Sequence, residues 1–201
     1  DFLGNASKAN INSGAVFNAA VNSIWKGVIE FSDKSIEIAS KINVKEINLN
    51  TTSGEKVVKI KNHLEAENIK FGQSTIDVGI NDALIKVATE ATYNATTLNL
   101  NQNRLQLDGT GKHSLSGNIT VKANIDDNTT NIGNIILLNG TTLNMAGVTE
   151  LVFYVDDQRT SKEEMTYTLI ESPIALDTTF TDLITDEKVI AVGSNMIYEW
   201  K

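Results

Sequence analysis

The phrase Thr96-Thr97-Leu98-Asn99-Leu100 returns almost unchanged as Thr141-Thr142-Leu143-Asn144-Met145. Related phrases begin at Glu46, Glu67 and Gly117, and each sets an apolar residue between polar ones. Aligning the first apolar residue of each phrase gives steps of 22, 29, 21 and 24 residues, through Ile47, Ile69, Leu98, Ile119 and Leu143. A period of this length, carried by short alternating runs, is typical of a β-solenoid in which each turn stacks on the one before.

Short runs of alternating apolar and polar residues continue along most of the chain. Val28–Phe31, Ser35–Ile38 and Ile42–Leu49 are examples. A half-buried strand requires this period of two, because successive side chains point to opposite faces of a sheet. Three such strands in a turn of about twenty residues would build one coil of a right-handed parallel β-helix. We therefore predict an all-β protein with this solenoid fold.

The pattern changes after Val155. Asp156–Glu164 is charged and too long for the corner of a coil, and the apolar runs beyond it are Thr166–Ile170, Lys188–Val192 and Met196–Trp200. Longer strands with larger loops indicate an antiparallel hairpin region that covers the last coil, whose core and backbone groups would otherwise be open. We divide the chain into β-helix coils over 1–149 and a β-rich cap over 150–201.

Two segments leave alternatives open. Ala15–Val21 fits either a short helix or a strand, and we favour the strand. Within the long step, Leu84, Val87 and Ala91 have helical spacing after Asp82, which is placed as an N-cap. A helix over 81–95 would be an excursion from the solenoid that carries a binding surface. The alternative, which we favour, is one more strand or a packing turn.

Composition limits the classes of function. The chain of 201 residues has a net charge of −8 and a pI of about 4.8, so it lacks the concentrated basic face that nucleic-acid binding needs. It contains no cysteine, which excludes disulfides and thiolate metal sites. The longest apolar run, Leu151–Val155, is too short to cross a bilayer as a helix. No signal peptide opens the chain at Asp1, and we expect it to begin partway along a longer protein.

The phrases Asn139–Gly147 (NGTTLNMAG) and Gly117–Ile125 (GNITVKANI), with Leu151–Asp157 followed by Thr166–Ser172, resemble the passenger domain of a classical autotransporter of Gram-negative bacteria. The bias toward Asn, Ile and Lys is similar to that of rickettsial surface-antigen passengers. The resemblance covers residues 26–201. It implies a fragment of an exported protein, tethered through a C-terminal β-barrel that this chain lacks.

The same resemblance implies a place and a partner. The protein would lie on the bacterial cell surface at the outer membrane, or be released outside the cell. Adhesion to a host cell-surface protein or glycan is the commonest role of such passengers. The chain would be a monomer that is not itself inserted in the membrane. A structural stalk for an absent N-terminal module is a further alternative, because it needs the same solenoid.

Hydrolytic chemistry finds little support in the sequence. No Gly-x-Ser-x-Gly motif is present, and His113 and Ser114 are neighbours that would point to opposite faces of a strand. His63 and His113 are therefore expected at solvated surface positions. A lyase-like β-helix would need carboxylates on adjacent coils, for which Asp126–Asn128 and Asp156–Arg159 are the candidates. Their separation of 30 residues does not match the period, so we expect solvated turns and assign no catalytic, cofactor-binding or metal-binding residue.

Overall fold

The computed structural model describes residues 8–11, 27–31, 35–39, 41–94, 97–128, 130–161, 163, 166–174 and 189–193. Over these ranges the chain is all-β, as predicted, and contains no helix. The strands are β1 (Lys8–Ile11), β2 (Val28–Phe31), β3 (Ile36–Ile38), β4 (Ile42–Ile60), β5 (Leu64–Val78), β6 (Ala83–Tyr93), β7 (Thr97–Asn101), β8 (Arg104–Asp108), β9 (Lys112–Ile125), β10 (Thr130–Ile132), β11 (Asn134–Leu137), β12 (Thr142–Asp157), β13 (Ile170–Glu171) and β14 (Val189–Gly193).

The strands pair in three parallel ladders, which we call A, B and C. Ladder A joins the first residues of β4, β5 and β6 to β8, β11 and β13. Ladder B joins β1, β2, the middle of β4 and β5, the end of β6 and the beginning of β9 and β12. Ladder C joins β3, the end of β4 and β5, β7, the later parts of β9 and β12, and β14.

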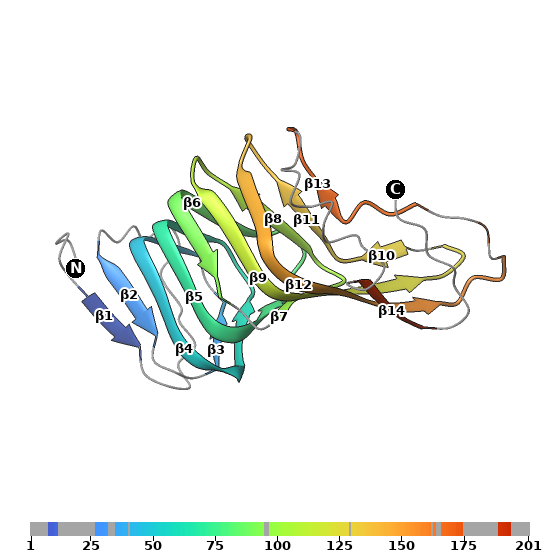
Figure 1. The fold of residues 1–201 in the computed structure, drawn as a ribbon, viewed down its shortest axis with the longest axis horizontal. Coiled ribbons are helices and arrows are strands. Elements are labelled where there is room, and N and C mark those ends of the chain that lie inside the picture. Colours follow the sequence, from blue (N-terminus) through green and yellow to red (C-terminus); the bar gives the residue numbers. More distant parts are fainter. Residues whose placement is uncertain are drawn as a thin grey trace.

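The chain passes from ladder A to B to C and then returns to A, so each passage lies beside the previous one. Figure 1 shows β2, β4, β5, β6, β9 and β12 side by side in this order along the molecule. The long strands β4, β5, β9 and β12 each continue from one ladder into the next, bending at the corners.

Apolar side chains stack in register inside the three ladders. The buried rows are Ile42, Leu64, Ile85, Leu107 and Leu137 in ladder A; Ile29, Ile47, Ile69 and Ala91 in ladder B; and Val58, Ile76, Leu98, Ile119 and Leu151 in ladder C. Every strand thus contributes alternate residues to one continuous core. Burial of these β-branched and Leu side chains is the main stabilising term.

The register gives a regular repeat of 22 residues from Ile47 to Ile69 to Ala91 to His113. The repeat predicted from the sequence is therefore only partly right. Ile47 and Ile69 do pair, but Leu98 and Ile119 lie in ladder C, whereas Leu143 lies in ladder B beside His113. The two best copies of the phrase occupy different ladders. All three ladders use the same alternation of residues, so matching phrases by their apolar positions does not distinguish one ladder from another.

One passage is longer than the others, with 30 residues between His113 and its ladder partner Leu143. The extra length is a hairpin: β9 continues to Ile125, and β10 returns antiparallel to it, with Thr130 opposite Ile125. The end of β12 follows the extended part of β9 as far as Asp157. Figure 1 shows this extension leaving the stacked strands toward the C-terminal side.

The segment over 81–95 forms a strand, which confirms the alternative that we favoured. Ala83–Lys86 pairs in ladder A and Glu90–Tyr93 pairs in ladder B. Asp82 does not cap a helix; it has a φ of 61° and sits in the turn before β6. Its carboxylate forms an ion pair with Arg104 of the next passage, and the Oδ2–Nη2 distance is 2.7 Å.

The C-terminal region differs from the prediction in direction. β14 pairs parallel with β12, and β13 pairs parallel with β11, so neither forms the expected antiparallel hairpin. Both strands add to existing ladders, where parallel pairing follows from the direction of travel. The runs Ala15–Val21 and Met196–Trp200 lie outside the described residues. β12 crosses position 150 without a break, and the division into coils and cap stays a prediction.

Candidate binding groove

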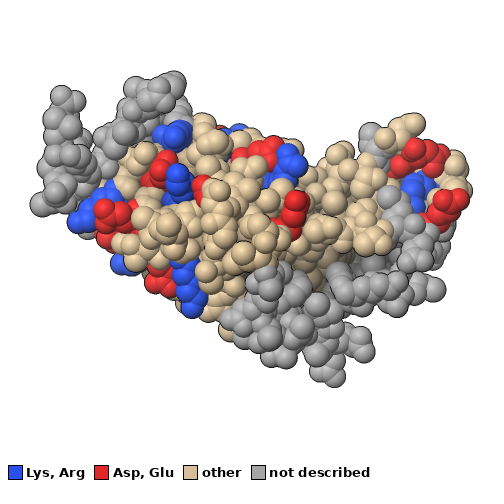
Figure 2. Space-filling view, turned by 90° about the horizontal axis from the view of Figure 1, so that it is seen from above, with Lys and Arg blue, Asp and Glu red and all other residues tan. Residues whose placement is uncertain are grey.

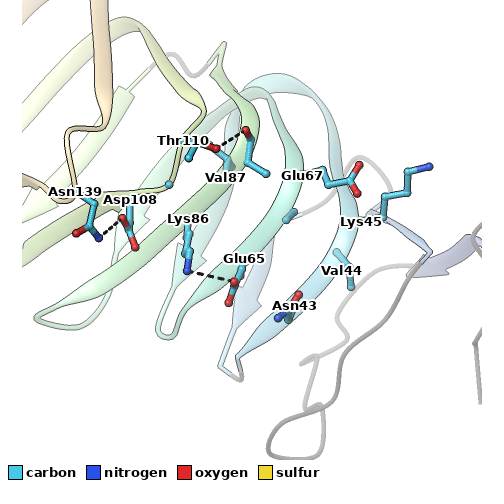
Figure 3. Close-up of a pocket in the computed structure, with 13 residues that line it drawn as sticks. Asn43, Val44, Lys45, Glu65, Glu67, Lys86, Val87, Asp108, Thr110 and Asn139 are labelled. Carbon is cyan, nitrogen blue, oxygen red and sulfur yellow. Dashed lines mark hydrogen bonds and ion pairs between the residues drawn. The ribbon is translucent and has the colours of Figure 1, made fainter.

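A groove with a volume of about 730 Å³ runs across the corner between ladders A and B. Four successive passages contribute three residues each, and one residue comes from the turn after β11: Asn43–Lys45, Glu65–Glu67, Lys86–Ala88, Asp108–Thr110 and Asn139. Because the contributing strands stack along the molecule, the groove is elongated in that direction. Figure 3 shows the labelled side chains in sequence from Asn43 to Asn139.

The floor of the groove consists of small or buried residues at the corner. Val44, Ala66 and Val87 are buried, and Ala88 is exposed beside them. The next passage lies directly on this backbone: the Thr110 hydroxyl donates to the Ala88 carbonyl oxygen at 3.0 Å. An added Cβ at Gly109 would lie 1.9 Å from the Val87 carbonyl oxygen, so glycine is required for this approach.

Charged side chains of both signs line the groove. Asn43, Glu65, Lys86 and Asp108 are consecutive partners in the register of ladder A. The Glu65 carboxylate lies 3.5 Å from Lys86 Nζ and 3.8 Å from Lys41 Nζ. With exposed fractions of 43% for Lys86 and 32% for Glu65, such a pair contributes at most about 1 kcal/mol to stability. Both groups can therefore exchange this contact for a ligand at little cost.

The groove ends at a buried carboxylate. Asp108 is 8% exposed, and its Oδ1 accepts a hydrogen bond from Asn139 Nδ2 at 2.8 Å, drawn in Figure 3. Burial is the largest influence on the pKa of Asp108 and acts to raise it. The hydrogen bonds from Asn139 and from the Gly109 backbone, with the charge of Lys86, together bring this pKa below its usual value. Asp108 is thus a fixed negative charge.

Charges of opposite sign are interspersed over the face of the molecule seen in Figure 2. Lysine and arginine lie among aspartate and glutamate near the N-terminal passages, and a second charged group lies at the opposite end. The groove shares this mixed character. A ligand that carries several polar groups of both kinds is better matched to it than a polyanion.

His113 lies in the core, and the prediction of a solvated position is wrong for it. Its side chain is fully buried, with Nε2 3.1 Å from the Asp108 carbonyl oxygen and Nδ1 2.9 Å from the Tyr93 hydroxyl. A carbonyl oxygen only accepts, so Nε2 carries the proton and the Tyr93 hydroxyl donates to Nδ1. Ser114 is half-buried on the opposite face, as predicted. His63 is half-buried on another passage.

The two carboxylate stretches do lie side by side, which overturns the expectation from their spacing. Asp157 is the ladder partner of Ile125, and the Thr160 hydroxyl donates to Asp127 at 2.8 Å. The hairpin lengthens this passage by the residues that the regular period lacked. Within the described residues, no group of three His, Cys, Asp or Glu side chains is arranged to hold a metal ion.

Arg159 occupies the centre of this charged end. Its Nε and Nη2 donate to the two oxygens of Asp157 at 3.0 and 2.8 Å, and its Nη1 donates to the Glu163 carbonyl oxygen at 2.9 Å. Asp157 is almost fully buried under this fork. The fork-shaped contact orders the loop that follows β12.

The groove could not have been located from the sequence. Asn43, Glu65, Lys86 and Asp108 come from four passages and share no motif, and only their strand register brings them together. Comparison with known proteins does not add to the site: no family model, curated protein or solved structure matches this chain. No described segment is a helix of the length and apolarity needed to cross a bilayer.

Proposed function

We propose that the chain is a right-handed parallel β-helix that acts as a non-enzymatic binding scaffold, as the passenger part of a surface-exposed autotransporter. The three parallel ladders, visited in the same order in each passage, support the solenoid. Parallel strands joined by crossovers are right-handed in nearly all proteins, which gives the handedness. The sequence resemblance supports the assignment to a passenger at the bacterial surface.

The groove is the observation that carries the binding role. It is open along its length, spans four passages, and presents carboxylate, ammonium, amide and hydroxyl groups in a fixed register. An extended ligand that contacts several passages at once gains many modest interactions, as is usual for solenoid binding surfaces. A host cell-surface protein or glycan, in extended form, is the partner that we propose.

A lyase-like carbohydrate-active enzyme is the second candidate, because the two carboxylate stretches are neighbours. Their carboxylates are already engaged, however: Asp157 binds Arg159 and Asp127 binds Thr160. Cleavage of an acidic polysaccharide by the purified chain, abolished by a calcium chelator, would establish this activity in place of simple binding.

Attachment to cells tests the adhesin proposal. Beads coated with the chain are expected to attach to cultured mammalian cells above beads coated with an unrelated acidic β-protein, and free chain should compete. The groove variant Lys86→Glu places a third negative charge beside Glu65 and Asp108, so we expect attachment to fall by about tenfold.

Lys59→Glu is the matched control for this variant. Lys59 has a similar exposed fraction of 39% and an ion pair with Asp77 at 3.9 Å, but it lies in ladder C, away from the groove. Equal loss of attachment by both variants would remove the groove from the proposal. No attachment by the folded chain would favour the stalk.

A further inference from the structure

The turn between β11 and β12 contains the only Asn-Gly pair of the chain, Asn139-Gly140. Both residues have positive φ, 52° and 73°, and the Thr141 amide donates to the Leu138 carbonyl oxygen at 3.0 Å to close the turn. This is the conformation that an Asn-Gly pair favours in a two-residue turn. Both residues are exposed, and an added Cβ at Gly140 would meet no atom within 4 Å.

The side chain of Asn139 has a structural task. Its amide donates to Asp108 across the stack, and Thr141, which follows the turn, is buried with its hydroxyl oxygen 3.1 Å from the Gly109 carbonyl oxygen. These two contacts hold the turn after β11 against the turn after β8. The chemical identity of the residue 139 side chain as an amide, with a donor group, is therefore essential at this place.

From these observations we propose that Asn139 is a deamidation site, and that its conversion replaces the hydrogen bond to Asp108 by a contact between two carboxylates. This would loosen the turn at one end of the groove. The inference does not rest on the proposed binding function, because it concerns the covalent chemistry and stability of the chain alone.

The reaction needs only water. The backbone nitrogen of Gly140 attacks Cγ of Asn139; the N–Cγ bond forms, the bond from Cγ to Nδ2 breaks, and ammonia leaves with the proton from the Gly140 amide. Water then opens the resulting five-membered imide at either carbonyl and yields aspartate or isoaspartate. Glycine after asparagine favours the attack, because no Cβ obstructs the approach of its nitrogen.

The product is poorly matched to its surroundings. Asp108 is buried and has no other position to adopt, so a carboxylate at residue 139 would face it at hydrogen-bond distance. Two carboxylates in contact cannot both be ionised without repulsion, which raises the pKa of the pair. Lys86 and His113 are the other titratable groups that act on Asp108, and they face it in both forms of the protein.

Peptide mass mapping tests the reaction. The full chain is incubated folded at mildly alkaline pH and body temperature, then digested. The peptide that contains Asn139 is expected to gain one mass unit over days, and to become a substrate for isoaspartyl methyltransferase. Asn131, equally exposed but followed by Ile132, is the internal control and should keep its amide. Gly140→Ala should slow the change at least tenfold.

The consequence is tested with defined variants. Asn139→Asp is compared with Asn139→Gly, which loses the same hydrogen bond without adding charge and tolerates the positive φ. At neutral pH the midpoint of thermal unfolding of Asn139→Asp should lie several degrees below that of Asn139→Gly. The deficit should disappear near pH 4, because a raised carboxyl pKa costs stability only as pH rises. The exchange Asp108→Asn/Asn139→Asp should restore the midpoint by reversing the hydrogen bond.

Either of two results would overturn the proposal. The first is an unchanged mass at residue 139 in the folded chain under conditions in which the denatured chain deamidates. The second is equal stability of Asn139→Asp and Asn139→Gly at neutral pH, with no effect of the exchange variant.

Discussion

Gly109→Ala should lower the stability of the protein by about 3 kcal/mol or more, which is the largest effect that we expect from a single methyl group. Two costs combine at this position. The backbone has a φ of 106°, which side chains with a Cβ rarely adopt, and the new Cβ would lie 1.9 Å from the Val87 carbonyl oxygen. The atom in the way is backbone, so only a shift of two stacked passages relieves the clash.

Two other glycines separate these costs. Gly111 has no positive φ but would place a Cβ 2.7 Å from the Thr89 backbone, whereas Gly140 has a φ of 73° and open space. Gly111→Ala should therefore show the steric cost alone, and Gly140→Ala only the conformational cost of about 1 kcal/mol. Chemical denaturation of the three variants measures the effects. A Gly109→Ala variant no less stable than Gly140→Ala would mean that the two passages are not in close contact.

Acidification should destabilise the protein through His113 between about pH 6.5 and pH 4. Burial of the imidazole, the largest influence, lowers its pKa to about 4, although the Asp108 carbonyl and carboxylate act in the opposite direction. The unfolded chain therefore binds a proton that the folded chain refuses, and stability falls as pH falls. The loss is complete below the folded pKa and amounts to roughly 3 kcal/mol.

The geometry around His113 explains why the charged form fits poorly. A proton on Nδ1 would meet the Tyr93 hydroxyl, whose own proton now points at that nitrogen. The hydroxyl would have to turn and become an acceptor inside a core where Tyr93 stacks on Phe71 at a centroid distance of 4.8 Å. A buried donor without an acceptor is costly.

Thermal unfolding of wild type and His113→Leu across this pH range tests the prediction. His113→Leu should be less stable at pH 7, because it leaves the Tyr93 hydroxyl and the Asp108 carbonyl without their partner. Its midpoint should fall less on acidification than that of the wild type, by about 10 °C at pH 4. His63→Gln is the control for removing a histidine, and a curve of the same shape for wild type and His113→Leu would contradict the assignment.

Several features of the fold could be predicted from local sequence. The alternating runs gave the strands over Val28–Phe31 and Ile42–Leu49, because each residue's face on a strand depends only on its position along the strand. Asn139-Gly140 and the segment from Asp108 to Lys112 form turns as predicted, with positive φ at both Asn139 and Gly109. These are properties of a few neighbouring residues and need no knowledge of distant ones.

Features that depend on which strands become neighbours could not be predicted in this way. The register pairs Ile69 with Ala91 and Leu98 with Ile76, although the apolar phrases matched Ile69 with Leu98. His113 is polar by type, yet its place in a row of ladder B, between Ala91 and Leu143, puts it in the core. The 30-residue separation of the carboxylate stretches hid a hairpin that brings them together.

By itself the sequence determined that this protein is built from short strands with tight Asn- and Gly-containing turns, because alternation and backbone conformation are local. The tertiary structure alone decided the parallel ladders, the burial of His113 and the groove lined by Glu65, Lys86 and Asp108. The physical reason is that hydrogen bonds between strands join any two backbones equally well. Which strands meet is therefore decided by the packing of the whole core and the lengths of all the turns together.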